Sequence, residues 1–248
     1  MTGNPAATSA VLIIGNEVLS GRTQDANLAF LAARLSDLGI PVIEARVVPD
    51  EEDGIIEALQ ALQARATYVF TTGGIGPTHD DITAAAIAKA FGVPLVRDPE
   101  ALRRLREHYA GLDVNEARLK MADVPQGATL IDNPVSTAPG FRIGNVFVLA
   151  GVPSIARAMF DALAPSLAGG PPVVSRTVPC SIPEGDFAAD LAQVQARHPD
   201  VSIGSYPFFR PGRVGVNLVI RGTDPAAVDA AAADVEAMVQ RLVRQRGV

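Results

Sequence analysis

The sequence predicts an α/β fold, with a three-layer domain around a mostly parallel sheet and a second, smaller α+β domain. Over the first two-thirds of the chain, apolar runs of strand length alternate with helical patterns. That order indicates parallel strands covered by helices on both faces. The composition then changes at Gly169-Gly170-Pro171-Pro172, which is typical of a linker. We therefore expect two domains, residues 1–170 and residues 171–248.

The first domain is expected to begin with a buried parallel strand over 10–14, because that run is continuously apolar. A helix over 25–38 follows, since its leucines share one face and Gly39 is a suitable C-cap. The other helices are expected over 51–64, 82–91, 100–109 and 154–163. The other strands are expected over 41–48, 67–71 and 145–150.

The second domain is expected to have a different order, strand, helix, strand, strand, helix. The two adjacent strands, joined through Arg210-Pro211-Gly212-Arg213, indicate a hairpin. Asp224 before Pro225 is a strong helix start, with a capping side chain followed by proline at the first helical position. The expected strands are 173–178, 201–206 and 214–220, and the expected helices are 186–197 and 225–244.

Composition excludes several classes of protein. The chain is 48% hydrophobic, which excludes a disordered chain, and its net charge of −6 argues against binding to nucleic acid or to a membrane surface. Cys180 is the single cysteine, so no internal disulfide forms. Charges interrupt every long apolar run, and residues 1–9 do not resemble a signal peptide. We therefore expect a soluble cytoplasmic protein.

The segment 71–83, Thr-Thr-Gly-Gly-Ile-Gly-Pro-Thr-His-Asp-Asp-Ile-Thr, is the most informative part of the sequence. Its glycines let the backbone approach a ligand closely, and N–H groups at a helix start attract phosphate. Two adjacent aspartates would repel phosphate unless a divalent cation lay between them. The alternative is that Thr78, Asp80 or Asp81 simply caps the helix. The candidate phosphate ligands are Gly73, Gly74, Gly76 and Thr78, and the candidate metal ligands are Asp80 and Asp81.

Other candidate residues follow other strands, where ligands bind in parallel sheets. Glu17, after the first strand, is either a metal ligand or a turn cap. Asp50, after the second strand, is either a metal ligand or the N-cap of the next helix, or both. Ser136 and Thr137 lie in a proline-flanked loop that could bond a ligand with little ordering cost. That loop could equally be a structural turn.

These loops together resemble the MoaB/Mog molybdopterin-binding domain family, and most closely the N-terminal half of CinA proteins and the related domain of some FAD synthases. The resemblance is carried by the motifs GNEVLSG (15–21), VPDE (48–51), TTGGIGPTHDDIT (71–83), NPVSTAPGF (133–141) and AGVPS (150–154). It continues into IGSYPFF (203–209), which resembles the second domain of the CinA type.

The resemblance implies a domain that binds a phosphorylated pterin or nucleotide. In Mog enzymes, metal-dependent adenylyl transfer uses aspartates that match Asp50 and Asp81 here, whereas CinA proteins are linked to hydrolysis of nucleotide pyrophosphates. Asn16, Ser136 and Ile155 depart from the usual residues of the family. The amidohydrolase domain of CinA and the nucleotidyl-transferring domain of FAD synthase do not follow, so neither activity is expected.

From the residues and the resemblance we expect metal-dependent hydrolysis of a nucleotide pyrophosphate similar to ADP-ribose or FAD. Asp50 and Asp81 would be catalytic, with Mg²⁺ or a similar cation held by them and by Asp80 or Glu17. No side chain is an obvious general base, so the metal would activate the water. The alternatives are a non-catalytic pterin- or nucleotide-binding protein, and adenylyl transfer in molybdenum cofactor assembly. The resemblance also implies a homo-oligomer.

Overall fold

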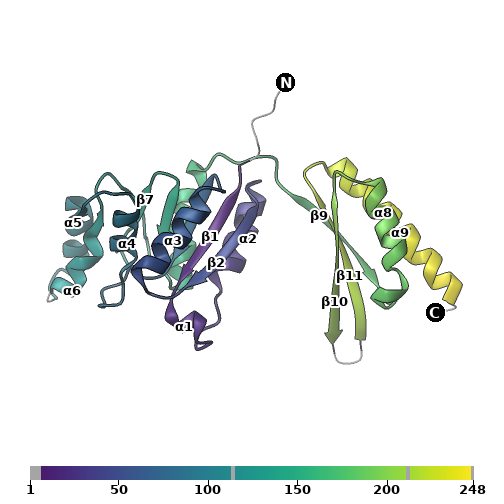
Figure 1. Ribbon diagram of the computed structural model, residues 1–248, viewed down its shortest axis with the longest axis horizontal. Helices are drawn as coiled ribbons and strands as arrows, with labels where there is room; N and C mark the ends of the chain where they lie inside the picture. Colours follow the sequence, from purple (N-terminus) through teal and green to yellow (C-terminus); the bar gives the residue numbers. More distant parts are fainter. Residues whose placement is uncertain (1–6, 113–114, 211–212, 247–248) are drawn as a thin grey trace, which may run out of the picture. The chain divides into compact units, whose positions relative to one another are not determined.

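The computed structural model describes residues 7–112, 115–210 and 213–246 of the chain. The chain divides into two compact units, Met1–Gly170 and Pro171–Val248. Figure 1 shows the first unit in purple to green and the second in green to yellow. Each unit has its own sheet and its own hydrophobic core.

A six-stranded mixed sheet forms the centre of the first unit, in the order β2-β1-β3-β8-β7-β6. The first four strands in this order are parallel. β7 runs antiparallel to both of its neighbours, β8 and β6, so β7 alone runs opposite to the rest of the sheet. The strands are β1 (Ser9–Ile14), β2 (Val42–Val48), β3 (Tyr68–Thr72), β6 (Thr129–Ile131), β7 (Gly140–Ile143) and β8 (Val146–Leu149). The mostly parallel sheet is confirmed. The sequence did not reveal β6 and β7, because strands of three or four residues are too short to show periodicity.

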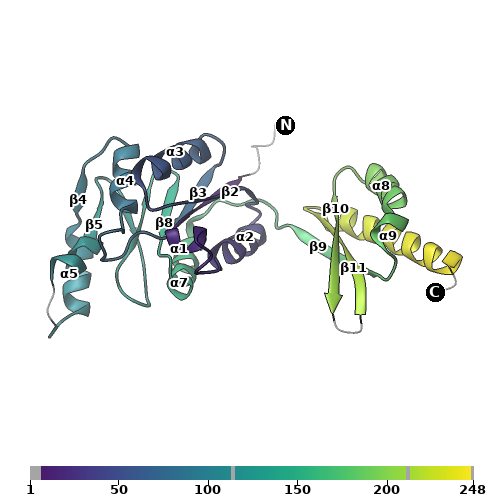
Figure 2. The same cartoon turned by 60° about the horizontal axis from the view of Figure 1, so that its bottom comes forward.

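Helices cover both faces of this sheet. α3 (Glu52–Gln63) and α4 (Thr83–Ala90) lie on one face, and α2 (Asn27–Asp37) and α7 (Pro153–Leu163) lie on the other (Figure 2). Successive residues of a strand point to opposite faces. Leu12 of β1 accordingly packs with α3 and α4, and its neighbours Val11 and Ile13 pack with α2 and α7. The three-layer α/β architecture is therefore confirmed.

Between α4 and β6 the chain forms a smaller cluster beside the sheet. It contains β4 (Leu95–Arg97) paired antiparallel with β5 (Asp123–Pro125), together with α5 (Pro99–His108), α6 (Glu116–Leu119) and the 3₁₀ helix η1 (Lys120–Ala122). Ala101, Leu105 and Ala122 form its buried centre. Two short elements complete the first unit, α1 (Asn16–Leu19) and the 3₁₀ helix η2 (Ala164–Ser166).

The second unit is an antiparallel three-stranded sheet, ordered β10-β11-β9, with α8 and α9 packed on one face (Figure 1). Its elements are β9 (Val174–Cys180), η3 (Glu184–Asp186), α8 (Ala188–Arg197), β10 (Ser202–Arg210), β11 (Arg213–Gly222) and α9 (Pro225–Arg246). The hairpin is confirmed, since β10 and β11 pair as far as Arg210 and Arg213. Pro211 and Gly212, expected in its turn, lie outside the described residues. The Asp224 carboxylate accepts a hydrogen bond from the N–H of Ala226 at 2.9 Å, as expected for a cap.

Two further observations concern the single cysteine and the apolar character of the helices. Cys180 is a free thiol buried in the core of the second unit. In the part of the chain that the structure describes, no helix combines the length and the apolar character needed to cross a bilayer.

Candidate functional site

A cavity of about 380 Å³ opens at the carboxyl ends of β1, β3 and β8. This is the edge of a parallel sheet at which ligands bind. Ile14, Ile75 and Met159 give the cavity apolar walls, and residues from five loops complete it. Loops that lie far apart in the sequence therefore meet at one place, as the motif analysis predicted. An apolar cavity with a few polar groups is typical of a small-molecule site.

The glycine loop (residues 73–81) requires glycine at two of its positions for steric reasons. Gly73 has φ 102°, and a Cβ there would lie 2.1 Å from the carbonyl oxygen of Ile14. Gly74 has φ 68°, and a Cβ there would lie 2.1 Å from Oγ1 of Thr83. The hydroxyl of Thr83 donates a hydrogen bond to the carbonyl of Gly73 at 3.0 Å. The loop therefore passes closer to β1 and α4 than any side chain would allow.

Some backbone N–H groups of the glycine loop have partners within the protein and others do not. The N–H of Gly73 donates to the carbonyl of Leu149 at 3.2 Å, so it already has a partner. The N–H groups of Gly74, Ile75 and Gly76 have no partner among the described residues. All three residues line the cavity. Consecutive N–H groups without partners form an anion-binding concavity, which suits phosphate.

Asp81 fixes the turn at the end of the glycine loop. Its Oδ2 accepts hydrogen bonds from the N–H of Thr78 at 2.8 Å and from the hydroxyl of Thr78 at 2.6 Å. The capping alternative is wrong, because the N-cap of α4 is Ile82 and no side chain caps that helix. Asp81 lines the cavity. Thr78, which was expected to bind phosphate, is not among the lining residues and instead bonds Asp81.

Three further carboxylates, from Glu17, Asp50 and Asp80, line the cavity. Oδ2 of Asp50 accepts the N–H of Asn16 at 2.9 Å, which joins the loops after β1 and β2. The expected capping role of Asp50 is wrong, because the N-cap of α3 is Glu51 and that cap has no side-chain hydrogen bond. The pKa of Asp80 is lowered, chiefly by the Thr78 side chain, then by a backbone N–H and by the nearby charges of His79 and Lys120.

These carboxylates are oxygen donors of the type that Mg²⁺ takes, but they do not form a complete ligand set by themselves. Among the described residues, no three His, Cys, Asp or Glu side chains converge closely enough to form a metal-binding group by themselves. Mg²⁺ is commonly held by one or two carboxylates together with substrate phosphates and water. Asp50 has one carboxylate oxygen in a hydrogen bond and the other without a described partner. The donor set therefore fits a cation that is shared with a bound phosphate.

The asparagine loop (residues 132–138) also lines the cavity, and Asn133 organises it. The Oδ1 of this buried side chain accepts the N–H groups of Val135 and Ser136 at 3.0 and 3.1 Å. Its Nδ2 donates to the hydroxyl of Ser136 at 2.7 Å and to the carbonyl of Ala138 at 2.8 Å. Asn133, Ser136 and Ala138 line the cavity. The Asn-Pro pair is the sequence signal that could have identified this turn.

Thr137 does not line the cavity, although its position in the sequence predicted that it binds the ligand. It has φ 67°, and it is the one non-glycine residue with positive φ in the described part of the chain. Its hydroxyl lies 3.0 Å from Nδ1 of His108, at the end of α5. Thr137 therefore holds the asparagine loop to the neighbouring helix, and of the two hydroxyl residues only Ser136 lines the cavity.

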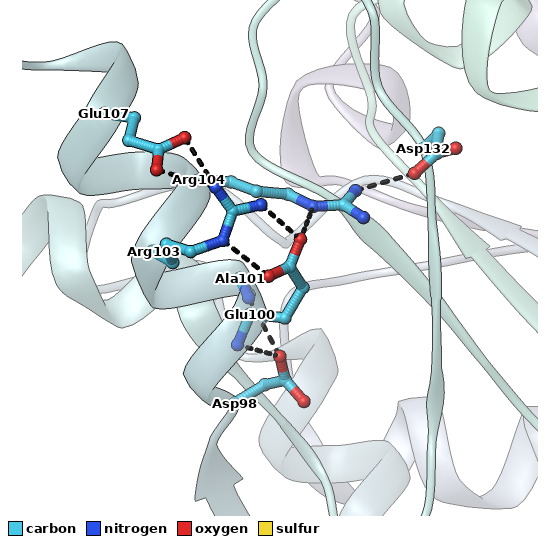
Figure 3. Close-up of polar contacts among 7 residues, drawn as sticks. All are labelled: Asp98, Glu100, Ala101, Arg103, Arg104, Glu107 and Asp132. Atoms are coloured by element: carbon cyan, nitrogen blue, oxygen red, sulfur yellow. Dashed lines mark hydrogen bonds and ion pairs between the residues drawn. The ribbon is translucent and has the colours of Figure 1, made fainter.

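α5 holds the other end of the asparagine loop through an ion-pair network (Figure 3). Arg104 bonds Glu100 on its own helix at 2.8 Å and Asp132 of the loop at 2.6 Å. Arg103 bonds Glu100 and Glu107 at 2.7 and 2.6 Å. These arginines hold the pKa of Glu100 at about 2, through hydrogen bonds first and charge second. The sequence shows the charged helix, but not that it contacts the loop.

Two further side chains fix the loops that line the cavity, and the sequence alone did not reveal either of them. Nζ of Lys120 donates to the carbonyl of Thr78 at 2.6 Å, which holds the glycine loop to η1. Nδ2 of Asn27, a buried side chain of α2, donates to the carbonyl of Gly151 at 2.8 Å. Both contacts join segments far apart in the sequence. His79, in contrast, is almost fully exposed.

Comparisons with known proteins agree with this geometry. Residues 10–169 match the family described as a probable molybdopterin binding domain. The chain belongs to this molybdopterin-binding domain family. The lining residues of the cavity, between Ile14 and Met159, all fall inside the molybdopterin-binding domain. Residues 172–246 match the FAD synthase middle domain.

Similar proteins extend the comparison over both units. A protein from Pyrobaculum calidifontis is 41% identical over 211 residues, which cover 81% of this chain and 80% of that protein. A CinA-like protein from Syntrophus aciditrophicus is 38% identical over 95% of this chain, which spans 59% of that relative. The crystal structure of CinA from Thermoplasma acidophilum has a TM-score of 0.62 and 37% identity, and the match covers 66% of this chain and 99% of that one. The chain is thus a CinA-type member of its family.

Proposed function

We propose that this protein hydrolyses a nucleotide pyrophosphate similar to ADP-ribose or FAD, with a divalent cation such as Mg²⁺. One observation carries the proposal: the cavity brings unpartnered N–H groups of the glycine loop together with carboxylates from three separate loops. The N–H groups suit a phosphate, and the carboxylates suit a cation beside it. The similarity to CinA-type proteins and to the FAD synthase middle domain supports a nucleotide ligand.

In the proposed reaction, water attacks one phosphorus of the P–O–P linkage. A new P–O bond forms, the bond from that phosphorus to the bridging oxygen breaks, and the second phosphate leaves with the bridging oxygen. The two protons of the water pass to the two product phosphates, and each product keeps its proton or releases it to solvent according to pH. Gly74 and Gly76 would bind the phosphate through their N–H groups, and Asp81 would hold the turn that positions them.

The proposed cation would be held by Asp50 with Asp80, Asp81 or Glu17, all of which line the cavity. When bound, it would neutralise the charge on the phosphates and lower the pKa of water. The apolar walls of Ile14, Ile75 and Met159 would exclude other water and strengthen these charge interactions. The ligand could also be a phosphorylated pterin, which the same N–H groups would bind.

The test is a screen for phosphomonoester release from ADP-ribose, FAD, NAD⁺ and ATP, with and without Mg²⁺. Asp50→Asn is the informative variant, because Asn keeps an acceptor for the N–H of Asn16 while it removes the charge. We expect kcat to fall on the order of 10²-fold. Asp200→Asn, an exposed aspartate of the second unit, is the matched control and should retain full activity.

The alternatives predict other results. No turnover of any pyrophosphate, together with tight nucleotide or pterin binding that survives Asp50→Asn, would show a binding protein that does not catalyse hydrolysis. Release of pyrophosphate from ATP only in the presence of a pterin acceptor would show adenylyl transfer.

A further inference from the structure

A second, open hollow of about 600 Å³ adjoins the cavity. It is lined mainly by α1 and the turn that follows, and it shares Glu17, Asp50 and Asp80 with the cavity. The two hollows therefore meet at a ridge formed by these three carboxylates. On the cavity side of the ridge lie the N–H groups of the glycine loop, and on the other side lies the outer hollow.

Arg22 is the one cation among the residues that line the outer hollow. Its guanidinium has no ion pair or hydrogen bond with any described residue. Its charge is therefore available to an anion in the hollow. Leu19, which also lines the hollow and is 52% exposed, adds an apolar surface next to it.

The backbone holds Arg22 at this position. Gly21, directly before it, has φ 70°, a left-handed conformation that favours glycine. The N–H of Gly21 donates to the carbonyl of Val18 at 3.1 Å, and the N–H of Thr23 donates to the carbonyl of Glu17 at 3.0 Å. The turn is thus bonded on both sides of Arg22. The arginine belongs to a fixed turn that also carries Glu17 of the ridge.

We propose that the outer hollow binds the second half of a two-part nucleotide pyrophosphate, and that Arg22 selects for it by bonding its phosphate. This inference rests on the proposed function. The nucleoside half would occupy the apolar cavity, the P–O–P linkage would cross the carboxylate ridge, and the second phosphate with its sugar would lie beside Arg22. A guanidinium bonds phosphate oxygens in a bidentate manner, whereas the ridge carboxylates cannot bond them without a cation.

The charge arrangement favours such a substrate over a mononucleotide. A mononucleotide would place its single phosphate at the glycine loop and leave Arg22 unused. A substrate with two linked phosphates would use the glycine loop for one and Arg22 for the other. The protein would therefore bind a substrate with a second phosphate beyond the ridge more tightly than a mononucleotide, which lacks that phosphate.

The experiment compares the wild-type protein with Arg22→Gln by calorimetric binding in Mg²⁺. The ligands are AMP, ribose 5-phosphate and, in place of ADP-ribose, its analogue with a methylene bridge between the phosphates, which cannot be hydrolysed and is called ADP-ribose below. Because charge-assisted hydrogen bonds are lost, we expect ADP-ribose and ribose 5-phosphate to bind about tenfold more weakly. AMP should bind equally well to both proteins. Arg106→Gln is the matched control, since Arg106 is exposed on α5 and lines neither hollow. It should leave all three affinities unchanged.

The outcomes separate this inference from the proposed function. Equal weakening of AMP and ADP-ribose in Arg22→Gln, or no weakening of either, would overturn the role of Arg22 and leave hydrolysis standing. Failure of the wild-type protein to bind ribose 5-phosphate or ADP-ribose would also overturn the outer site. Selective weakening of ADP-ribose in a protein that hydrolyses no pyrophosphate would support the outer site and overturn the proposed hydrolysis.

Discussion

The glycine loop and the asparagine loop both line the cavity, but different kinds of contact hold them in place. The glycine loop depends on close approach of its backbone to Ile14 and to the Thr83 side chain, together with the bond from Gly73 to Leu149. Side-chain bonds from Thr83, Asp81 and Lys120 add to this packing. The asparagine loop is held by side chains. Asn133 bonds it internally, and α5 bonds it from 28 and 29 residues away in the sequence.

This difference predicts how the stability of each loop responds to mutation. Close backbone packing tolerates no added atom, so a single methyl group is enough to disrupt the glycine loop. Side-chain bonds to a neighbouring helix can be removed one at a time, each with a limited effect on stability. A single substitution should therefore disrupt the glycine loop, whereas each substitution in the contacts of the asparagine loop should lower stability by a small amount.

The largest effect is expected from Gly73→Ala. A Cβ at this position would lie 2.1 Å from the carbonyl oxygen of Ile14, and φ 102° is strained for alanine. We expect the free energy of unfolding to fall by about 3 kcal/mol or more, measured by urea unfolding. Gly54→Ala is the control, because nothing lies within 4 Å of the added Cβ in α3. It should stabilise the protein by about 0.5 kcal/mol, and an equal loss in both variants would contradict the steric argument.

The next effect is expected from Asn133→Ala, which removes two donated and two accepted hydrogen bonds from a buried side chain. The free energy of unfolding should fall by about 2 kcal/mol, and ligand affinity should fall with it, because Ser136 loses its position. Unfolding and calorimetric binding check both expectations. Asn16→Ala, at an exposed asparagine, should change stability by less than about 0.5 kcal/mol. A comparable loss there would refute the special role of Asn133.

A smaller effect is expected at the contact between Thr137 and His108. In a double-mutant cycle, Thr137→Ala and His108→Ala should couple by about 0.5–1 kcal/mol in the free energy of unfolding. Thr137→Gly sharpens the test, because glycine loses the hydroxyl but relieves the left-handed φ of 67°. It should therefore destabilise less than Thr137→Ala. Zero coupling together with equal losses at position 137 would show that this contact does not hold the loop.

The smallest effect is expected from Glu100→Gln, because its ion pair with Arg103 is exposed and its ion pair with Arg104 is only partly buried. The pKa of Glu100 is lowered from 4.5 to about 2 in the folded protein. A carboxylate whose pKa is lower in the folded state than in the unfolded state stabilises the fold fully at pH values above its unfolded-state pKa. That contribution is lost as the pH falls through its folded-state pKa. The stability difference from wild type should thus be present at pH 7 and shrink between pH 4.5 and pH 2.

Urea unfolding at several pH values measures this trend. Glu57→Gln, at an exposed glutamate of α3, should show no such pH dependence relative to wild type. A difference for Glu100→Gln that grows as pH falls would contradict the assigned network.

The sequence by itself determined the alternation of strands and helices, the linker near residue 170 and the glycine loop. These are local signals, because apolar runs mark β1 and β3 and because glycine and proline mark the turns between elements. No tertiary contact was needed to recognise them. The short strands β6 and β7 were not visible, because their pairing depends on β8 rather than on their own pattern.

The tertiary structure alone decided what the side chains at the site do. Glu17, Asp50, Asp80 and Asp81 were recognisable as carboxylates at strand ends, but only the fold placed all four on one cavity. Only the fold turned Thr137 toward His108 and Thr78 toward Asp81, away from the roles the sequence suggested. Local sequence fixes backbone conformation, whereas the partner of a polar side chain depends on which distant segment the fold brings within hydrogen-bonding distance.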